Sequence, residues 1–190
     1  MNPDIINGAV TFVVGFVAVG VYWLTKRSEK RAAATIVIMD IRHAEQVVLS
    51  ILEKGMVDRT MKNILHDNNW AKYKHLFAEN FSQDDFAAFN RFFEACVEIA
   101  DARKRMVDVF YSNVTAKAEI MHQKIFSIDD LLSPEGQLKK QKILHEINTD
   151  ESFFDPNEPK SRILHNLQLM GRLSNTVAFE KLKAIAGIST

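Results

Sequence analysis

The chain has few of the residues that interrupt helices or cross-link a fold. Its 190 residues include one cysteine, four prolines and seven glycines. The lone cysteine, Cys96, excludes an internal disulfide and falls in an apolar helical pattern, so we expect it to be a small buried side chain in a reducing compartment. The sequence also lacks runs of alternating β-branched residues bounded by turn dipeptides. These absences predict an all-α fold with long uninterrupted helices.

The chain also lacks an excess of charge of either sign. It carries 24 basic and 24 acidic residues, and its formal net charge at pH 7 is zero. Binding to duplex nucleic acid depends mainly on phosphate neutralisation by surplus cations, so we expect no such partner. Any site for an anion would have to be a local cluster of basic residues.

The common catalytic signatures are missing as well. The sequence contains no GxxxxGK[ST], GxGxxG, HExxH, CxxC or GxSxG pattern. Its six histidines are scattered, and none lies four residues from another, so we expect no metal ion and no other cofactor. The sequence indicates a protein that is not an enzyme. One alternative is a hydrolase whose site is assembled from scattered acids and histidines, but no residue spacing supports it.

One long apolar run is present at the N-terminus. No charged residue occurs from Ile5 to Leu24, and its length of about 20 residues is what a helix needs to cross a hydrocarbon layer of ~30 Å. A secretory signal peptide carries its positive charges before a shorter apolar stretch, whereas here they follow it. The pattern predicts a retained transmembrane anchor over residues 1–27. The alternative is a buried helix of a soluble domain.

The residues at the end of the run predict the orientation of the anchor. Basic residues next to a spanning helix stay on the cytoplasmic side, and aromatic rings with polar tips favour the interface. We therefore expect the N-terminus outside and an all-helical cytosolic domain over residues 28–190. Topology and anionic lipid headgroups are sufficient to explain the basic residues. The predicted interface residues are Tyr22, Trp23, Lys26, Arg27, Lys30 and Arg31.

Small residues recur on one face of the expected span. Gly8, Thr11, Gly15 and Ala18 follow one another at helical spacings. Small side chains let helix backbones approach closely in lipid, so this face is a candidate seam for a homo-oligomer. The alternative is that glycine and alanine are simply common in membrane helices.

Turn signals divide the rest of the chain into further helices. A helix with one apolar stripe is expected from residue 28 to Gly55, and its stripe includes Ala34, Val37, Ile41, Ala44 and Ile51. The other expected helices cover residues 58–66, 70–78, 82–125, a segment from Pro134 onward, and 160–186 with a break near 171–175. The segment 82–125 is either one helix or two with a bend near its basic residues. Ser82 and Ser133 are the expected N-caps.

A second basic cluster lies within the longest predicted helix. The apolar phase of this helix, read through Phe93, Val97 and Ala100, reaches Lys104, where an ammonium group requires an acidic partner. Two interpretations remain open. The basic residues form a solvated or locally paired surface, or they form a phosphate-binding site. In the second case, the free backbone N–H groups at a helix start after Pro159 would also favour the anion. The candidate ligand-binding residues are Arg103, Lys104, Arg105, Lys160 and Arg162.

The order of these segments carries a resemblance. An apolar N-terminal span, a basic flank continuing into "RAAATIVIMDI", and a helical domain that reads "FAAFNRFFEACVEIADAR" in its middle resemble small bacterial inner-membrane proteins found near phage-defence genes. The layout is also similar to that of the membrane-anchored ancillary effectors of type III CRISPR systems. That resemblance implies a cytosolic domain that binds a cyclic oligoadenylate, and a location in the bacterial inner membrane.

Two functions of different kinds follow from these patterns. The first is an oligomeric membrane effector or sensor in antiphage defence. Its cytosolic helices would bind an anionic ligand such as a cyclic nucleotide and then perturb the membrane. The ligand could drive this change only if its affinity differs between two arrangements of the protein. The second is a constitutive membrane-anchored scaffold for a protein partner. A concentrated basic pocket would favour the sensor, and dispersed charge with an exposed apolar surface would favour the scaffold.

Overall fold

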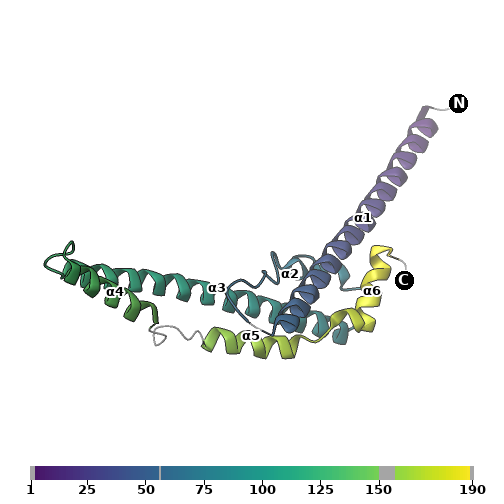
Figure 1. The fold of residues 1–190 in the computed structure, drawn as a ribbon. Helices are drawn as coiled ribbons and strands as arrows, with labels where there is room; N and C mark the ends of the chain where they lie inside the picture. Colours follow the sequence, from purple (N-terminus) through teal and green to yellow (C-terminus); the bar gives the residue numbers. More distant parts are fainter. Residues whose placement is uncertain (1–2, 56, 150–156, 189–190) are drawn as a thin grey trace. The chain divides into compact units, whose positions relative to one another are not determined.

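The fold is taken from a computed structural model, which describes residues 3–55, 57–149 and 157–188, apart from the side chains of residues 3–11 and 13. Across these described ranges the regular structure is helical throughout and contains no strand, which confirms the all-α prediction (Figure 1). In chain order the elements are α1 (Pro3–Lys54), α2 (Asn69–Tyr73), η1 (Lys74–Phe77), α3 (Gln83–Phe126), α4 (Pro134–Thr149), α5 (Asn157–Met170), η2 (Leu173–Asn175) and α6 (Val177–Ala186).

The first helix, α1, continues without a break from the apolar run into the following segment, over 52 residues. Its second half buries one stripe that includes Ala34, Val37 and Ile41, as the spacing of three and four predicts. The helix ends at Gly55, which has a positive φ of 64° and donates its N–H to the Ile51 carbonyl oxygen at 3.1 Å. This left-handed residue favours glycine and confirms the predicted stop.

The short helix predicted over residues 58–66 is wrong. The Asp58 carboxylate accepts hydrogen bonds from the Thr60 backbone N–H at 2.7 Å and from the Thr60 hydroxyl at 2.6 Å. Such local side-chain bonds compete with a helical backbone and fix a turn instead. The next prediction is confirmed, because α2 and η1 cover residues 69–77, and Asn68 caps α2 by accepting from the Ala71 N–H at 3.0 Å.

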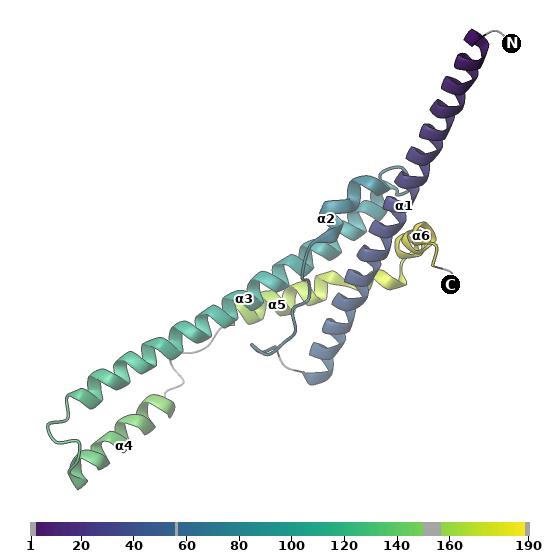
Figure 2. The same cartoon turned by 90° about the horizontal axis from the view of Figure 1, so that it is seen from above.

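After α1, the longest helix among the described residues is α3, which extends unbroken over 44 residues. Its start is fixed by a reciprocal cap: the Ser82 hydroxyl accepts from the Asp85 N–H at 3.2 Å, and Asp85 Oδ2 accepts from the Ser82 N–H at 2.8 Å. Ser133 caps α4 by accepting from the Gly136 N–H at 3.0 Å. In two views at right angles, α4 lies alongside the last turns of α3 (Figures 1 and 2).

The C-terminal region forms two helices, with the predicted break between them. The first, α5, begins at Asn157 rather than after Pro159, so Lys160 is its fourth residue and Arg162 its sixth. It ends before Gly171, whose φ is 62°, and the 3-10 turn η2 leads into α6. Thr176 caps α6 by accepting from the Phe179 N–H at 3.3 Å.

The chain divides into two compact units. The first unit contains Met1–Gln46, Leu65–Glu94 and Met170–Thr190, and the second contains Val47–Ile64 and Ala95–Leu169. Both α1 and α3 contribute residues to each unit. The expected boundary between an anchor at residues 1–27 and a domain at 28–190 is a different division and stays a prediction.

The interior of the first unit is an aromatic cluster around Trp70. The Trp70 ring stacks on Phe89 with a centroid distance of 4.5 Å and on Phe77 with a centroid distance of 6.0 Å, and its indole N–H donates to Asn90 Oδ1 at 2.8 Å. The Trp70 side chain is buried with its single polar atom hydrogen-bonded, which is how indole rings are stabilised in protein interiors. Phe81 and several further rings extend the cluster.

The second unit is held by apolar burial and by arginine side chains. Cys96, Ile99 and Met106 of α3 are buried, as is Ile163 of α5. The burial of Cys96 confirms the prediction of a small interior side chain. In the irregular segment after α1, the Met61 carbonyl oxygen accepts from Arg103 Nε at 2.7 Å.

Candidate functional site

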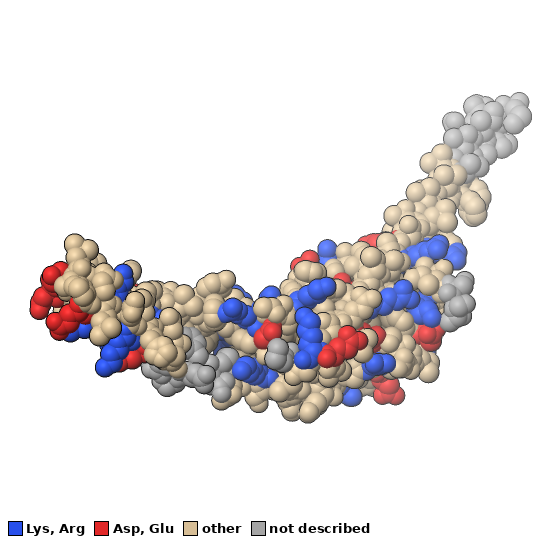
Figure 3. Space-filling model, viewed as in Figure 1, with Lys and Arg blue, Asp and Glu red and all other residues tan. Residues whose placement is uncertain are grey.

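In the first half of α1, the described side chains at residue 12 and from residue 14 to residue 24 are exposed all around the helix, and most of them are apolar. Phe12 is 76% exposed, Phe16 75% and Trp23 61%. In the space-filling view, the described part of this segment shows only uncharged residues, drawn tan, until charged side chains appear where it joins the rest of the chain (Figure 3). Within the part of the chain that the structure describes, no helix is found that is both long and apolar enough to cross a membrane. Side chains 3–11 and 13 of the expected span lie outside that described part.

The predicted interface residues differ in what they contact. Tyr22 and Trp23 are exposed, and the Arg27 guanidinium lies 5.7 Å from the Trp23 ring centroid. Lys26 pairs with Glu29 at 3.4 Å, with both side chains about half exposed. Lys30 is partly exposed.

Arg31 has a structural role that the explanation by topology and lipid headgroups does not include. Arg31 Nε donates to the Ala186 carbonyl oxygen at 2.8 Å, at the C-terminal end of α6. A cation there favours the negative end of the helix dipole. The following residue, Gly187, has a φ of 68°, and a Cβ built on it would lie 2.9 Å from an Arg31 nitrogen.

The predicted oligomer seam is only partly described. Gly15 has open space where a Cβ would lie, and Ala18 is exposed. The side chains of Gly8 and Thr11 lie outside the described residues. The seam stays a prediction.

The five predicted ligand-binding cations are all in the second unit, and the arginines among them contact protein acceptors. Arg162 of α5 pairs with Glu98 at 2.5 Å and with Asp101 at 3.1 Å, and these carboxylates raise the pKa of its guanidinium. Arg105 pairs with the same Asp101 at 3.2 Å. Arg103 donates to the Met61 carbonyl oxygen. This arrangement is a mixed network in which acidic side chains offset the arginines.

The prediction that Lys104 occupies the apolar phase of its helix is wrong. The buried positions of α3 pass through Ile99, Ala102 and Met106, and Lys104 is exposed. The apolar phase expected from the sequence passes through Val97 and Ala100, but the Val97 side chain is 43% exposed. In water the Lys104 ammonium group requires no acidic partner, so the physical argument for a ligand at this residue is lost.

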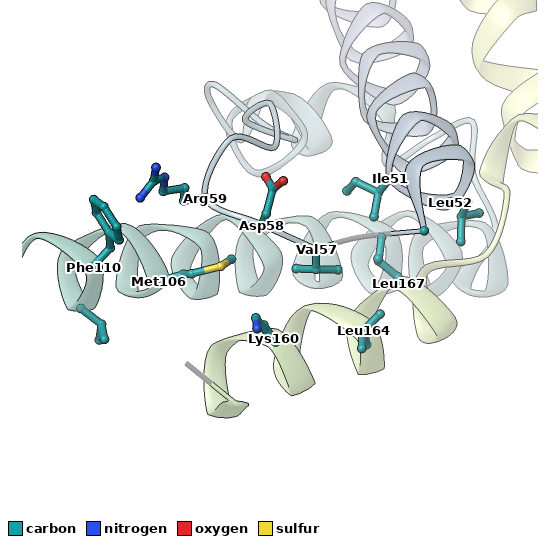
Figure 4. Close-up of a pocket in the computed structure, with 12 residues that line it drawn as sticks. Ile51, Leu52, Val57, Asp58, Arg59, Met106, Phe110, Lys160, Leu164 and Leu167 are labelled. Carbon is teal, nitrogen blue, oxygen red and sulfur yellow. The ribbon is translucent and has the colours of Figure 1, made fainter. Parts of the chain in front are cut away.

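A cavity of about 750 Å³ in the second unit was not anticipated from the sequence (Figure 4). The end of α1, the turn after it, α3 and α5 each contribute to its wall. Most of the wall is apolar, and the volume is typical of sites for small ligands. The lining residues are Ile51, Leu52, Gly55, Val57, Asp58, Arg59, Met106, Val109, Phe110, Lys160, Leu164 and Leu167.

The charged lining residues of this cavity are Asp58, Arg59 and Lys160. The Arg59 guanidinium lies over the Phe110 ring at 3.7 Å from the centroid, at one end of the cavity in Figure 4. The hydrogen bonds from Thr60 lower the pKa of Asp58, so this carboxylate stays ionised. Lys160 is the one predicted ligand-binding residue that lines the cavity.

Charges of both signs are intermixed on the domain surface shown in Figure 3, and that face lacks a broad patch of one sign. The described residues also contain no group of three or more histidine, cysteine, aspartate or glutamate side chains placed to hold a metal ion. Comparisons with protein-family models, curated proteins and solved structures give no match for this chain.

Proposed function

We propose that this protein is a single-pass membrane-anchored binding protein, without catalytic activity of its own, whose helical domain lies in the cytoplasm. The observation that carries the proposal is the contrast within α1. The described side chains at residues 12 and 14–24 expose large apolar groups on all sides, and the second half of the helix buries only one stripe. A helix that is apolar all around requires a nonpolar environment, which a bilayer provides.

The energetics favour lipid for the exposed segment. Full burial of a valine, leucine or phenylalanine side chain is favourable by about 1.5–3 kcal/mol. The exposed set at residues 12–24 includes Phe12, Phe16, Val17, Val19, Val21 and Leu24. Their transfer out of water is favourable by on the order of 10 kcal/mol, which far exceeds the cost of one threonine or asparagine in the run.

The binding part of the proposal rests on the cavity of the second unit. Because the sequence lacks catalytic signatures, we assign the cavity to ligand binding and not to a reaction. A ligand with an apolar body fits its lining better than a cyclic oligonucleotide does, since a ligand with several phosphates needs several cations. Arg105 and Arg162 already pair with Asp101, so such phosphates would have to compete with it.

The membrane part is tested by fractionation of the full-length protein expressed in bacteria. We expect the wild type to stay in the membrane pellet after an alkaline carbonate wash. The double variant F16R/V19R introduces two arginines that disfavour insertion by about 5–7 kcal/mol, so we expect it to be lost from the pellet.

The matched control is L132R/L138R, which places two arginines at side chains that are 91% and 70% exposed in the cytosolic domain. We expect it to fractionate as the wild type does. Wild-type protein that stays in solution without detergent would overturn the anchor. A C-terminal tag cleaved by protease in intact spheroplasts would overturn the orientation.

A further inference from the structure

We propose that the cavity of the second unit binds a long-chain carboxylate, with the alkyl chain along the apolar wall and the carboxylate group at Arg59. This inference rests on the proposed function only in its assignment of the cavity as a binding site. It does not depend on the membrane anchor.

The size and lining of the cavity support an alkyl chain. A volume of about 750 Å³ is in the range of ligand pockets and too large for a packing defect. Ile51, Leu52 and Leu167 lie toward the end opposite Arg59 in Figure 4. Each methylene group buried against such a wall is favourable by about 0.8 kcal/mol. A chain of this kind would gain affinity with its length.

The head group is inferred from Arg59. The Cζ atom of Arg59 lies over the Phe110 ring at 3.7 Å from the centroid. A guanidinium that covers a ring with its face keeps its in-plane N–H donors available, and these donors match a carboxylate in a bidentate geometry. No carboxylate among the described residues forms an ion pair with Arg59. Because the guanidinium is exposed on one side and held by the ring on the other, it is oriented for an incoming anion.

The charge of the cavity favours a monoanion. Its charged lining side chains are Arg59, Lys160 and Asp58, and Lys160 already has an interaction within the protein, so Arg59 is the single cation that we assign to the ligand. The Asp58 carboxylate already accepts two hydrogen bonds from Thr60 and is committed to its own turn. A single carboxylate head matches this balance, whereas a doubly charged phosphate head does not.

The test uses the full-length protein in amphipol and a fluorescent probe, 11-(dansylamino)undecanoic acid, displaced by unlabelled ligands. We expect saturable binding that dodecanoate displaces at least 10-fold better than dodecanol or lysophosphatidylcholine. Displacement by dodecanol as effective as by dodecanoate would overturn the carboxylate assignment.

Two pairs of matched variants locate the site. Leu164 lines the cavity and Leu169 does not, although both lie on α5 and are 52% and 53% exposed. We expect L164W to weaken probe binding at least 10-fold and L169W to leave it unchanged. R59Q should weaken dodecanoate about 10-fold more than it weakens dodecanol, and K139Q, on the exposed face of α4, should change neither.

Thermal unfolding shows whether L164W folds. If it does not, V109W serves as the second variant, because Val109 lines the same cavity from α3. Equal probe binding by the wild type and both tryptophan-filled variants would overturn the site. A partner helix as the true occupant would appear as this same negative result. Membrane fractionation of L164W should equal that of the wild type, so failure here is distinct from failure of the anchor.

Discussion

The first unit closes its interior around Trp70, whereas the second unit leaves a cavity of about 750 Å³ between its helices and the turn after α1. Trp70 is 2% exposed and its neighbour Phe77 is 0% exposed. In the second unit, apolar side chains such as Leu164 and Val109 line the cavity and remain partly open to solvent. The difference predicts that core substitutions cost more stability in the first unit, and that the unfilled space of the second unit is available for the ligand binding that we propose.

The largest effect is expected from removing the ring at the centre of the first unit. Trp70→Ala deletes the side chain that stacks on Phe77 and Phe89 and leaves Asn90 Oδ1 without its indole donor. We expect the free energy of unfolding to fall by about 3–5 kcal/mol, measured by urea denaturation in a mild detergent.

The control for this variant is Tyr111→Ala, which removes an aromatic side chain of the second unit that is 64% exposed. Its effect should stay within about 0.5 kcal/mol. Equal losses of stability for the two variants would contradict the comparison between a filled unit and an open one.

Local features of the fold could be predicted from the sequence because their causes are local. The apolar stripe of α1, its end at Gly55 and the caps at Ser82 and Ser133 depend on residues within a few positions of one another. The Asp58 turn was missed because its hydrogen bonds to Thr60 outweigh the weak helical pattern of residues 58–66.

The candidate site could not be predicted in the same way. Its wall comes from segments distant in sequence, such as Ile51, Met106 and Leu164, and no periodicity reports the space left between them. The sequence marks Arg59 only as a basic residue in a predicted short helix, with no signal of a binding site. The error at Lys104 came from a phase shift of the apolar stripe, since a helix of 44 residues offers more than one continuous row of apolar side chains.

A smaller effect is expected from the charge that ties α6 to α3 in the first unit. Asp85 is buried, and its Oδ2 accepts from Lys181 Nζ at 2.6 Å as well as from Ser82. The bond from Lys181, followed by those from Ser82, lowers the pKa of Asp85 despite the opposing effect of burial. We expect Asp85→Asn to destabilise the protein by about 1–3 kcal/mol at pH 7.

The sign of the pH dependence follows from the lowered pKa of Asp85. The stabilisation is fully present above the unfolded value of about 3.9 and is lost as the pH falls through the folded pKa. The stability difference between the wild type and Asp85→Asn should therefore shrink in acid, as measured by denaturation at a series of pH values. Asp84→Asn, an exposed neighbour in the same first turn, should show at most about 0.5 kcal/mol. A difference that grows toward low pH would contradict this assignment.

The smallest effect is expected at Asp40 of the first unit, whose pKa is shifted in the opposite direction to that of Asp85. Burial raises the pKa of Asp40, while the hydrogen bond that Asn69 Nδ2 donates to its Oδ2 at 3.0 Å opposes the rise. Ionisation of this group therefore disfavours folding as the pH rises from the unfolded pKa through the folded one. Asp40→Asn keeps an acceptor oxygen for Asn69 and removes the charge. We expect it to stabilise the protein at pH 7 by less than about 1 kcal/mol, because solvent still reaches the group. The gain should vanish below the unfolded pKa, and a loss of stability at pH 7 would show that the hydrogen bond outweighs burial.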